Sequence, residues 1–207
     1  MAELVDGGFL NPILVGGDRQ GRALYGADIK IVDHDGKELS WNGIAFGNLL
    51  CRGPWVTREY LNRGTEGAAD PDGWFDTGDV ATIDPEGYVH LIDRSKDVIK
   101  SGGEWISSIT LENIAVAHSD VAEAAIIAAK HPKWMERPLL LVVPRDQRRI
   151  DKQSILQLYE NAVPKWWVPD DVLVVEKLAY TATGKLNKLL LRSLHGDFLL
   201  NSKSADR

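Results

Sequence analysis

An α+β fold in two parts is predicted by three features of this 207-residue sequence. Up to residue 92, short alternating polar and apolar stretches end in glycine-containing turns, which is typical of a small β-barrel or sandwich. From residue 93, apolar strand patterns alternate with helical ones. The charge changes at the same place, because residues 1–92 contain 7 Lys or Arg against 15 Asp or Glu, and residues 93–207 contain 17 against 15. We therefore expect a β-barrel-like segment at 1–92 and a compact α+β domain, with a three-stranded sheet and helices, at 93–207.

Four strands are predicted in the first part. Asp28–Asp33 alternates polar and apolar residues, and an Asp-Gly turn follows it. Residues 47–52 form a second short apolar stretch that ends at Gly-Pro. Two further strands, 79–83 and 87–92, flank the sequence Asp-Pro-Glu-Gly, which is typical of a hairpin turn.

The second part alternates helices with strands. Ser108 is expected to cap a helix whose apolar residues recur at helical spacing. Val121–Ala129 is apolar on both faces, as in a strand that is buried on both sides. The other elements predicted here are strands at 139–143 and 172–176 and helices at 153–162 and 186–194.

The remaining segments and the cysteine content bear on location. Residues 1–19 match no structural pattern and stay an unassigned leader, while Thr57–Leu61 is expected to form one helical turn. The leader has neither a basic head nor an apolar core, so it does not predict a secretory signal. Apolar runs such as Val121–Ala129 are far shorter than the ~20 residues of a membrane span. The single cysteine, Cys51, excludes an internal disulfide and fits a reducing compartment, so we expect a cytoplasmic protein.

The distribution of charged residues and histidines indicates which kinds of ligand the chain is expected to bind. The uneven charge fits either two differently solvated surfaces or a second part that meets an anionic ligand through individually placed cations. No basic stripe is interleaved with aromatic residues, so no nucleic-acid partner is predicted. The five histidines share no metal-ligand spacing with cysteines or carboxylates, so no metal site is predicted.

Two motifs resemble one known family. The first is GWFDTGDVATIDPEGYVHLIDRSKDVIKSGGEWI at Gly73–Ile106, and the second is TATGKLNK at Thr181–Lys188. Together they resemble the AMP-forming acyl-CoA synthetases of the adenylate-forming (ANL) superfamily, over roughly residues 20–195. The resemblance is to the C-terminal portion of such an enzyme and looks closest to the medium- and long-chain fatty acyl-CoA ligase branch. It implies that residues 1–92 are the last part of a large adenylation domain and that 93–207 are the mobile C-terminal domain.

The first motif contains three candidate residues for the nucleotide. An aspartate in a turn, such as Asp79, most often accepts hydrogen bonds from nearby backbone N–H groups. The resemblance implies instead that Asp79 holds the ribose of AMP, and a carboxylate can accept hydrogen bonds from both ribose hydroxyls. Asp93-Arg94 would ordinarily be a surface pair. The resemblance implies that Asp93 is the hinge between the two parts and that Arg94 contacts the nucleotide.

The end of the first motif contains the candidate residues for CoA. Paired glycines usually mark a turn, although they also let a ligand approach the backbone closely. The resemblance implies that Gly102, Gly103, Glu104 and Trp105 line the tunnel for the pantetheine arm of CoA. Arg137 is expected to have a structural role, with contact to a CoA phosphate as the alternative. The pair Trp166-Trp167 fits either the core or a surface clamp.

Lys185 in the second motif is the predicted catalytic residue. The motif is not a phosphate-binding P-loop, because Ala179 replaces the first glycine and Leu186 replaces the Ser or Thr. A lysine in a Gly/Thr loop is usually a solvated turn residue. The resemblance implies that Lys185 reaches the reacting carboxylate and the α-phosphate as charge builds during adenylate formation.

The resemblance implies a whole enzyme that converts a fatty acid, ATP and CoA to acyl-CoA, AMP and pyrophosphate through an acyl-adenylate, with Mg²⁺ accompanying ATP. The phosphate loop and acyl pocket of the family match nothing in the chain. We therefore expect a large-domain partner upstream, and a chain that is inactive alone. The acyl chain length is not predicted.

Two alternatives stay open at this point. One is a non-catalytic nucleotide-binding, CoA-binding or assembly module that acts with an intact partner or as a homo-oligomer. The other keeps the enzyme class but replaces CoA by a carrier-protein arm or by oxidative light emission. The segments Gly102–Ser108 and Trp166–Asp170 argue against the second alternative, because their form is that of the fatty acyl branch.

Overall fold

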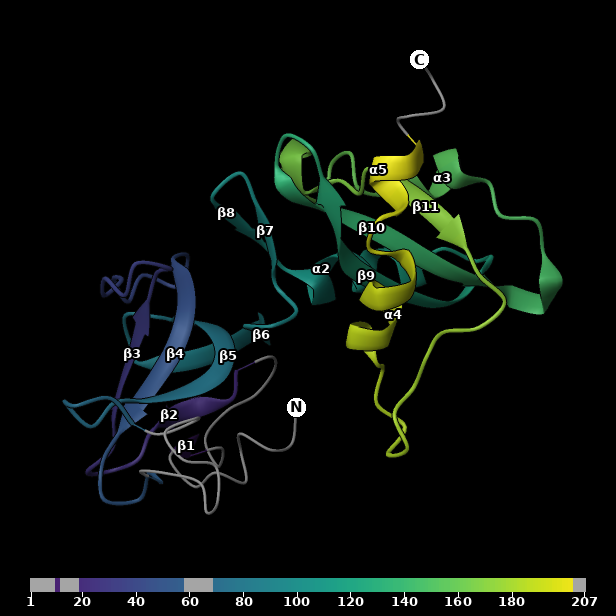
Figure 1. The fold of residues 1–207 in the computed structure, drawn as a ribbon. Helices are drawn as coiled ribbons and strands as arrows, with labels where there is room; N and C mark the ends of the chain where they lie inside the picture. The colour runs from purple at the N-terminus through teal and green to yellow at the C-terminus, as the bar shows by residue number, and fades with distance from the viewer. Residues whose placement is uncertain (1–9, 12–18, 58–68, 203–207) are drawn as a thin grey trace. The chain divides into compact units, whose positions relative to one another are not determined.

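The computed structural model describes residues 10–11, 19–57 and 69–202. The chain divides into two compact units, Met1–Lys96 and Asp97–Arg207 (Figure 1). The boundary expected between residues 92 and 93 lies within a strand just before this division. Most of the leader 1–19 and all but the first residue of the expected helical turn Thr57–Leu61 lie outside the described residues.

The first unit is a six-stranded antiparallel sheet in the order β1-β2-β6-β5-β4-β3, and it curls on itself (Figure 1). One face of the sheet packs a core that includes Ile31, Leu49 and Ile83, all fully buried. The turn after β5 is held by Asp84, whose carboxylate accepts hydrogen bonds from two backbone N–H groups of the turn, as the Asp-Pro-Glu-Gly pattern predicts. The strands are β1 (Leu10–Asn11), β2 (Gly21–Ala23), β3 (Asp28–Val32), β4 (Phe46–Arg52), β5 (Phe75–Ile83) and β6 (Tyr88–Arg94).

The second unit is built on β10, which pairs with three other strands. β9 pairs antiparallel along the full length of β10 on one edge. On the other edge, β11 pairs parallel at Leu139–Val142 and β7 pairs antiparallel at Met135. The strands are β7 (Ile99–Ser101), β8 (Glu104–Ile106), β9 (Val121–His131), β10 (Met135–Pro144) and β11 (Asp171–Val174). Three of them match the predicted strands, and the β7–β8 hairpin widens the sheet to five.

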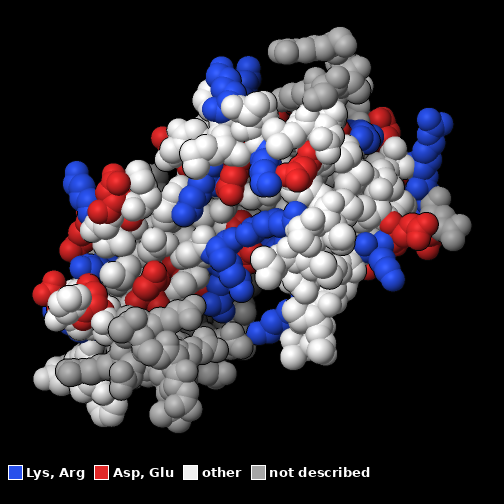
Figure 2. All heavy atoms as spheres, viewed as in Figure 1, with Lys and Arg blue, Asp and Glu red and all other residues white. Residues whose placement is uncertain are grey.

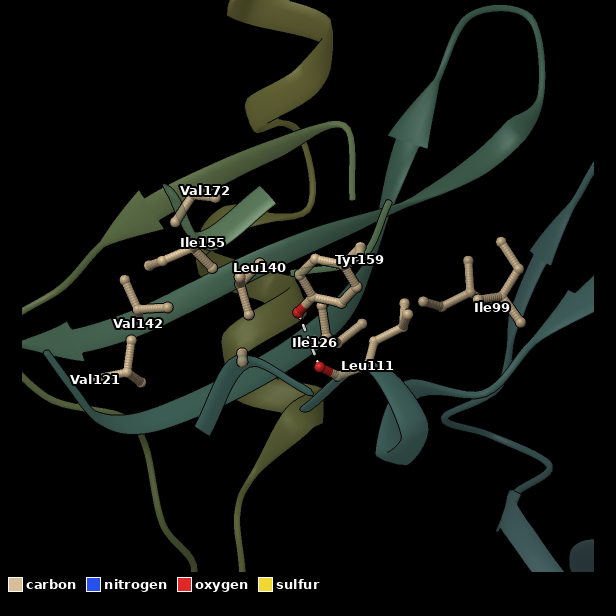
Figure 3. Packing of buried hydrophobic residues seen from close by; sticks show 11 residues of the cluster. Ile99, Leu111, Val121, Ile126, Leu140, Val142, Ile155, Tyr159 and Val172 are labelled. Atoms are coloured by element: carbon tan, nitrogen blue, oxygen red, sulfur yellow. Dashed lines mark hydrogen bonds between the residues drawn. The ribbon is translucent and has the colours of Figure 1, made fainter. Parts of the chain in front are cut away.

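Helices cover both faces of this sheet. They are α2 (Ser108–Val116), α3 (Lys152–Gln157), α4 (Lys188–His195) and α5 (Phe198–Ser202), with short 3₁₀ turns at Arg145–Gln147 and Lys165–Trp167. Consecutive residues of β9 and β10 point to opposite faces. On one face Ile126 and Leu140 pack with α2 and α3, as Figure 3 shows. On the other face Ile127 and Leu139 pack with α4 and α5. The apolar run predicted for Val121–Ala129 is therefore a strand buried on both sides, as expected.

Two helix ends differ from the sequence-based expectation. The N-cap of α2 is Ser107, whose hydroxyl accepts a hydrogen bond from the backbone N–H of Thr110, so the prediction of Ser108 as the cap was wrong by one residue. Ser108 is instead the first residue of the helix and is buried. Helix α3 ends at Gln157 rather than at residue 162, and a series of turns continues from there to the half-buried Val163. No helix among the described residues is both long enough and apolar enough to cross a membrane.

Tyr159 provides a test of the core of the second unit. Its ring is fully buried and its hydroxyl donates a 2.8 Å hydrogen bond to the carbonyl oxygen of Leu111 (Figure 3). Burial raises the pKa of Tyr159 above its ordinary range, so the hydroxyl stays protonated and remains a donor.

Tyr159→Phe is expected to lower the free energy of unfolding by about 1 kcal/mol, because the buried carbonyl loses its donor. The matched control is Tyr25→Phe, since Tyr25 is 100% exposed and loses no buried bond. Urea unfolding followed by tryptophan fluorescence measures both. Equal stability of the two variants would contradict a role for this hydrogen bond.

Candidate active-site residues

Asp79 and Arg94 face each other across the β5–β6 pair. The two residues are direct register partners, and Arg94 Nε lies 2.9 Å from Asp79 Oδ1. Asp79 sits immediately after Gly78, whose φ of 72° is accessible to glycine at little cost. The hydroxyl of Thr77 accepts a hydrogen bond from the backbone N–H of Asp79 and donates one to the carbonyl of Leu49. Thr77 and Gly78 lie within β5, opposite an irregularity in its pairing with β4, so the turn that the sequence suggested before Asp79 is part of the strand. The pairing of β5 with β6 sets Asp79 opposite Arg94.

The Asp79 carboxylate is buried with one oxygen unused. Its side chain is 4% exposed, and Oδ2 has no hydrogen-bond partner among the described residues. Burial raises the pKa of Asp79 to about 6, although the Arg94 guanidinium acts in the opposite direction. A buried oxygen without a donor is costly to the fold, and a ligand hydroxyl could supply the missing hydrogen bond.

Asp93 lies next to Arg94 at the end of β6. Its side chain is buried, it pairs in register with Val80, and its Oδ1 accepts a 2.8 Å hydrogen bond from the backbone N–H of Arg94. The expected hinge residue therefore belongs to the sheet of the first unit, and the division between the units follows after Lys96.

Gly102 and Gly103 form the two-residue turn between β7 and β8. Both have positive φ, 60° and 89°, which the common type I′ hairpin turn requires at its two central positions. A Cβ at Gly102 would lie 2.9 Å from the ring of Trp134, whereas a Cβ at Gly103 would meet nothing within 4 Å. The backbone N–H of Gly102 also donates to the carbonyl oxygen of Trp134. The hairpin tip is thereby held against the β9–β10 turn, with Gly103 open to a ligand.

This tip is one wall of a groove of about 840 Å³ within the second unit. Its other walls come from the β9–β10 turn and from the 3₁₀ turn Lys165–Trp167. The lining is both basic and aromatic: Ser101, Gly102, Glu104, His131, Lys133, Trp134, Arg137, Lys165, Trp166 and Asp170. Such a lining suits a ligand that combines anionic groups with a flat ring.

Arg137 holds the groove together. Its Nε lies 2.6 Å from Asp170 Oδ1, and its other nitrogens donate to the carbonyl oxygens of Trp166 and Val168 and to the Ser101 hydroxyl. Its side chain is only 12% exposed. A planar guanidinium that donates to four acceptors has a structural role, which is what the sequence suggested for Arg137.

The sequence left open whether Trp166 and Trp167 belong to the core or form a surface clamp, and the structure gives the two residues different positions. Trp166 is 42% exposed and lines the groove, whereas Trp167 packs against the core beneath the sheet. The two rings meet edge to face, with centroids 5.8 Å apart. The half-buried ring of Trp167 therefore supports the exposed ring of Trp166.

Lys185 lies at the end of a tight exposed turn. The backbone N–H of Gly184 donates to the Thr181 carbonyl oxygen, and that of Thr181 donates to the Lys185 carbonyl oxygen. Gly184 has a φ of 78°, and a Cβ there would meet nothing within 4 Å. The turn is closed at its base by a bridge between Tyr180 and Leu186, and α4 begins two residues later.

The structure brings the predicted residues together in two groups and leaves Gly103, Trp105 and Lys185 outside both. Asp79, Asp93 and Arg94 are neighbours in the first unit. Gly102 and Glu104 line the groove of the second unit. The half-buried ring of Trp105 is absent from the lining and lies 5.9 Å from Lys100 Nζ, and Lys185 is also absent from it.

Four residues of the groove lie outside the motifs and segments from which a function was predicted: His131, Lys133, Trp134 and Lys165. The only signal in the sequence was the turn-forming His-Pro-Lys-Trp between two apolar strands, which does not show that this turn meets the paired glycines.

Basic and acidic side chains lie next to each other over much of the face in Figure 2. Among the described residues, the one acidic and histidine cluster with suitable spacing for a metal is the turn Asp33-His34-Asp35. Asp33 in that turn already accepts two backbone N–H groups.

Comparison with known proteins agrees with the motifs. Residues 110–185 match the AMP-binding enzyme C-terminal domain. The chain thus carries a C-terminal domain of AMP-binding enzymes, and its relatives include acyl-CoA ligases. It is 46% identical over 186 residues to a medium-chain-fatty-acid–CoA ligase of Ectopseudomonas oleovorans, which covers 90% of the chain and 34% of the relative. It is 48% identical over 182 residues to a 3-methylmercaptopropionyl-CoA ligase of Ruegeria lacuscaerulensis, which covers 88% and 34%.

The solved structures agree with the fold. ATP-bound MatB from Rhodopseudomonas palustris is similar with a TM-score of 0.78 and 30% identity, over 91% of the chain and 38% of that protein. The α+β class is thus confirmed for a C-terminal portion of the family. The chain spans about a third of the length of the curated relatives it matches.

The buried carboxylate predicts an unusual pH dependence of stability. In the folded protein the pKa of Asp79 is about 6, so its carboxyl group stays largely protonated between pH 4 and 6. In the unfolded chain the same group has its ordinary pKa and has already lost the proton in this range. Raising the pH through this window therefore favours unfolding.

Relative to Asp79→Asn, the wild-type chain should lose up to about 3 kcal/mol of stability from pH 4 to 6.5 and then level off. Denaturant unfolding of both proteins at several pH values measures the difference, and ¹³C NMR of the carboxyl group gives the midpoint directly. A midpoint near 4 would show that Arg94 outweighs burial.

Proposed function

We propose that this chain is the C-terminal part of an AMP-forming fatty acyl-CoA ligase. The whole enzyme joins a carboxylate to the α-phosphate of ATP with release of pyrophosphate. It then transfers the acyl group from AMP to the thiol of CoA. The observation that carries the proposal is Asp79, which is buried beside Arg94 with one carboxylate oxygen unused, in a chain whose relatives are acyl-CoA ligases.

Asp79 would hold the ribose. Oδ1 is engaged by Arg94, and Oδ2 is the acceptor left for a ribose hydroxyl. Binding would lower the cost of burying this oxygen without a donor, which gives the nucleotide part of its affinity. Arg94 is half-buried and remains beside Asp79 to contact the nucleotide. The triphosphate and its Mg²⁺ would be held by the large domain of the complete enzyme.

Lys185 would supply charge during adenylation. The reacting carboxylate and the α-phosphate become more anionic together in the transition state, and an ammonium group placed there stabilises that state more than the substrates. Its position at the end of an exposed turn is compatible with reaching a ligand that the second unit does not itself hold. Asp93 would be the pivot that lets residues 93–207 move between the two half-reactions.

The groove of the second unit would receive CoA. Its volume of about 840 Å³ lies within the range of small-molecule sites. Lys133 and Lys165 can meet phosphate groups, and the exposed ring of Trp166 can stack on adenine. The open turn at Gly103 would let the pantetheine arm pass close to the backbone.

The partners of the whole protein follow from this proposal. A large domain would supply the phosphate loop and the acyl pocket, so the fatty acid and ATP would bind only to the combined protein, whereas CoA would bind to the groove of the second unit. The relatives act, by name, on medium-chain fatty acids and on 3-methylmercaptopropionate, which supports a carboxylate substrate without fixing its length. A cytoplasmic location fits the buried single thiol of Cys51.

A binding or assembly module without catalysis is the second candidate. It is favoured by one observation, which is that all residues of the groove belong to the second unit, so that CoA binding there needs no other domain. The two candidates differ in whether a large domain restores adenylation.

Lys185→Ala tests the enzyme proposal. In a complex of the chain with the large domain of a family member, ATP–pyrophosphate exchange should appear, and the variant should slow it by roughly 10²–10³-fold because one transition-state cation is lost. The matched control is Lys177→Ala, another exposed lysine on the same unit, which should leave exchange unchanged. Undiminished exchange by Lys185→Ala, with thermal unfolding unaltered, would remove Lys185 from the mechanism.

Trp166→Ala tests the groove. Isothermal titration of CoA into the chain alone should give saturable binding. The variant should weaken it by roughly 1–3 kcal/mol, the usual value of base stacking on an aromatic ring. Trp55→Ala removes an exposed tryptophan of the first unit and is the control. Equal CoA affinity of both variants would place CoA elsewhere.

A further inference from the structure

Lys188 is a buried cation at the start of helix α4. Its side chain is 9% exposed, and its Nζ lies 2.7 Å from Glu112 Oε1 and donates a 2.6 Å hydrogen bond to the Ser108 hydroxyl. It follows Lys185 by only three residues. The cluster of Lys188, Glu112 and Ser108 therefore lies at the base of the turn that carries the proposed catalytic lysine.

Local preference does not favour a lysine at this position. The first turn of a helix carries the positive end of its dipole, so a cation there is disfavoured. Burial of an ammonium group costs further free energy, which a buried ion pair repays only in part, and apolar replacements of such pairs are often no less stable. Residues that go against local preference mark functional positions more often than stabilising ones.

The cluster joins segments that lie far apart in the sequence. Ser108 is the first residue of α2, which follows the hairpin of Gly102 and Gly103 directly. Glu112 Oε1 also accepts a 2.8 Å hydrogen bond from the backbone N–H of Ile126, in the middle of β9. The base of the Lys185 turn is thus fixed to the sheet and to the helix that follows the hairpin.

A second ion pair fixes the same helix four residues later. Arg192 Nη2 lies 2.9 Å from Asp97 Oδ1, just before β7. Residues four apart lie on one face of a helix, so Lys188 and Arg192 hold α4 to the two ends of the segment 97–112. Between them the buried Leu191 packs in the core that contains Ile127 and Leu139. Two ion pairs one turn apart therefore tie one face of α4 to this segment.

We propose that Lys188 is a positioning residue for Lys185, acting through its buried pair with Glu112. The turn Thr181–Lys185 is exposed, so the direction in which it presents the ammonium group depends on how firmly its base is held. Misplacement of a catalytic group by about 1 Å can cost on the order of 100-fold in rate. The inference rests on the proposed function, because it requires Lys185 to act in adenylation.

The hairpin has supports of its own. Ser101 pairs with Met135, and Gly102 bonds to Trp134, so neither depends on Lys188. Loss of the Lys188 pair should therefore impair adenylation, which uses Lys185, and spare acyl transfer to CoA, which uses the groove. General damage to the fold would lower both reactions alike.

The test compares Lys188→Met with Lys152→Met in the complex of the chain with a large domain. Lys152 also forms a 2.9 Å ion pair, with Asp171, but it is 49% exposed and lies on α3. Adenylation is measured by ATP–pyrophosphate exchange, and acyl transfer by CoA consumption from supplied acyl-adenylate. Lys188→Met should lower kcat of exchange roughly 10- to 100-fold while acyl transfer stays within about twofold, and Lys152→Met should change neither.

Two further measurements keep the inference falsifiable. In the chain alone, hydrogen exchange of the Thr181–Lys185 amides should be faster in Lys188→Met than in Lys152→Met. In the complex with a large domain, the double variant Lys188→Met/Glu112→Gln should lose no more ATP–pyrophosphate exchange than the worse single variant, because the two side chains act through one ion pair.

The outcomes separate the two proposals. If Lys185→Ala is fully active, the proposed function fails and the inference fails with it. If Lys185→Ala is impaired while Lys188→Met exchanges pyrophosphate within about twofold of wild type, or loses both half-reactions equally, only the inference is overturned. Unchanged amide exchange in the turn would overturn it as well.

Discussion

Strand β10 is the constraint on which the second unit depends. Its side chains are buried on both faces, and both of its edges are paired, so every other element of the unit is placed relative to it. Each core side chain on this strand contributes about 1.5–3 kcal/mol of burial. The groove is held by β10 through Arg137, whereas the base of the Lys185 turn is tied through Glu112 to β9, the neighbour of β10 in the sheet.

Contacts with the sheet hold the exposed turns of the second unit, so the candidate residues on these turns have defined positions. The hairpin tip rests on the turn that precedes β10, and the 3₁₀ turn with Trp166 is fastened by Arg137 from β10 itself. On the other face α4 is fixed to the sheet through Glu112 and carries the lysine turn at its start. In the first unit the same principle holds on a smaller scale, since the β5–β6 register sets Asp79 against Arg94.

The proposed ligands divide between the units according to charge. Asp79 offers a hydrogen-bond acceptor to neutral ribose hydroxyls, whereas the groove and Lys185 offer cations to phosphates. The sequence shows this division as a change of net charge between its two parts, with the cations placed individually beside acidic residues. In the proposed ligase, the nucleotide and CoA would contact different units, so neither unit alone would bind every substrate.

The sequence by itself determined the class of fold, most strands and the identity of the candidate residues. Period-two alternation marks β3 and β4, and an apolar run marks β9, because burial of one or both faces dictates those patterns. Asp79 and Lys185 stand in motifs whose glycines are required by local backbone angles alone. Such signals are local, so they can be read without knowledge of the fold.

Only the tertiary structure decided which distant residues meet. The contacts of Gly102 with Trp134, of Arg137 with Asp170 and of Lys188 with Glu112 depend on strand order and helix packing. The roles of the two serines before α2 also depend on the tertiary structure, because Ser107 caps the helix while the buried Ser108 accepts a hydrogen bond from Lys188. No pattern within a short window specifies such pairs, since each follows from the way two separate segments bury their apolar faces on the same sheet.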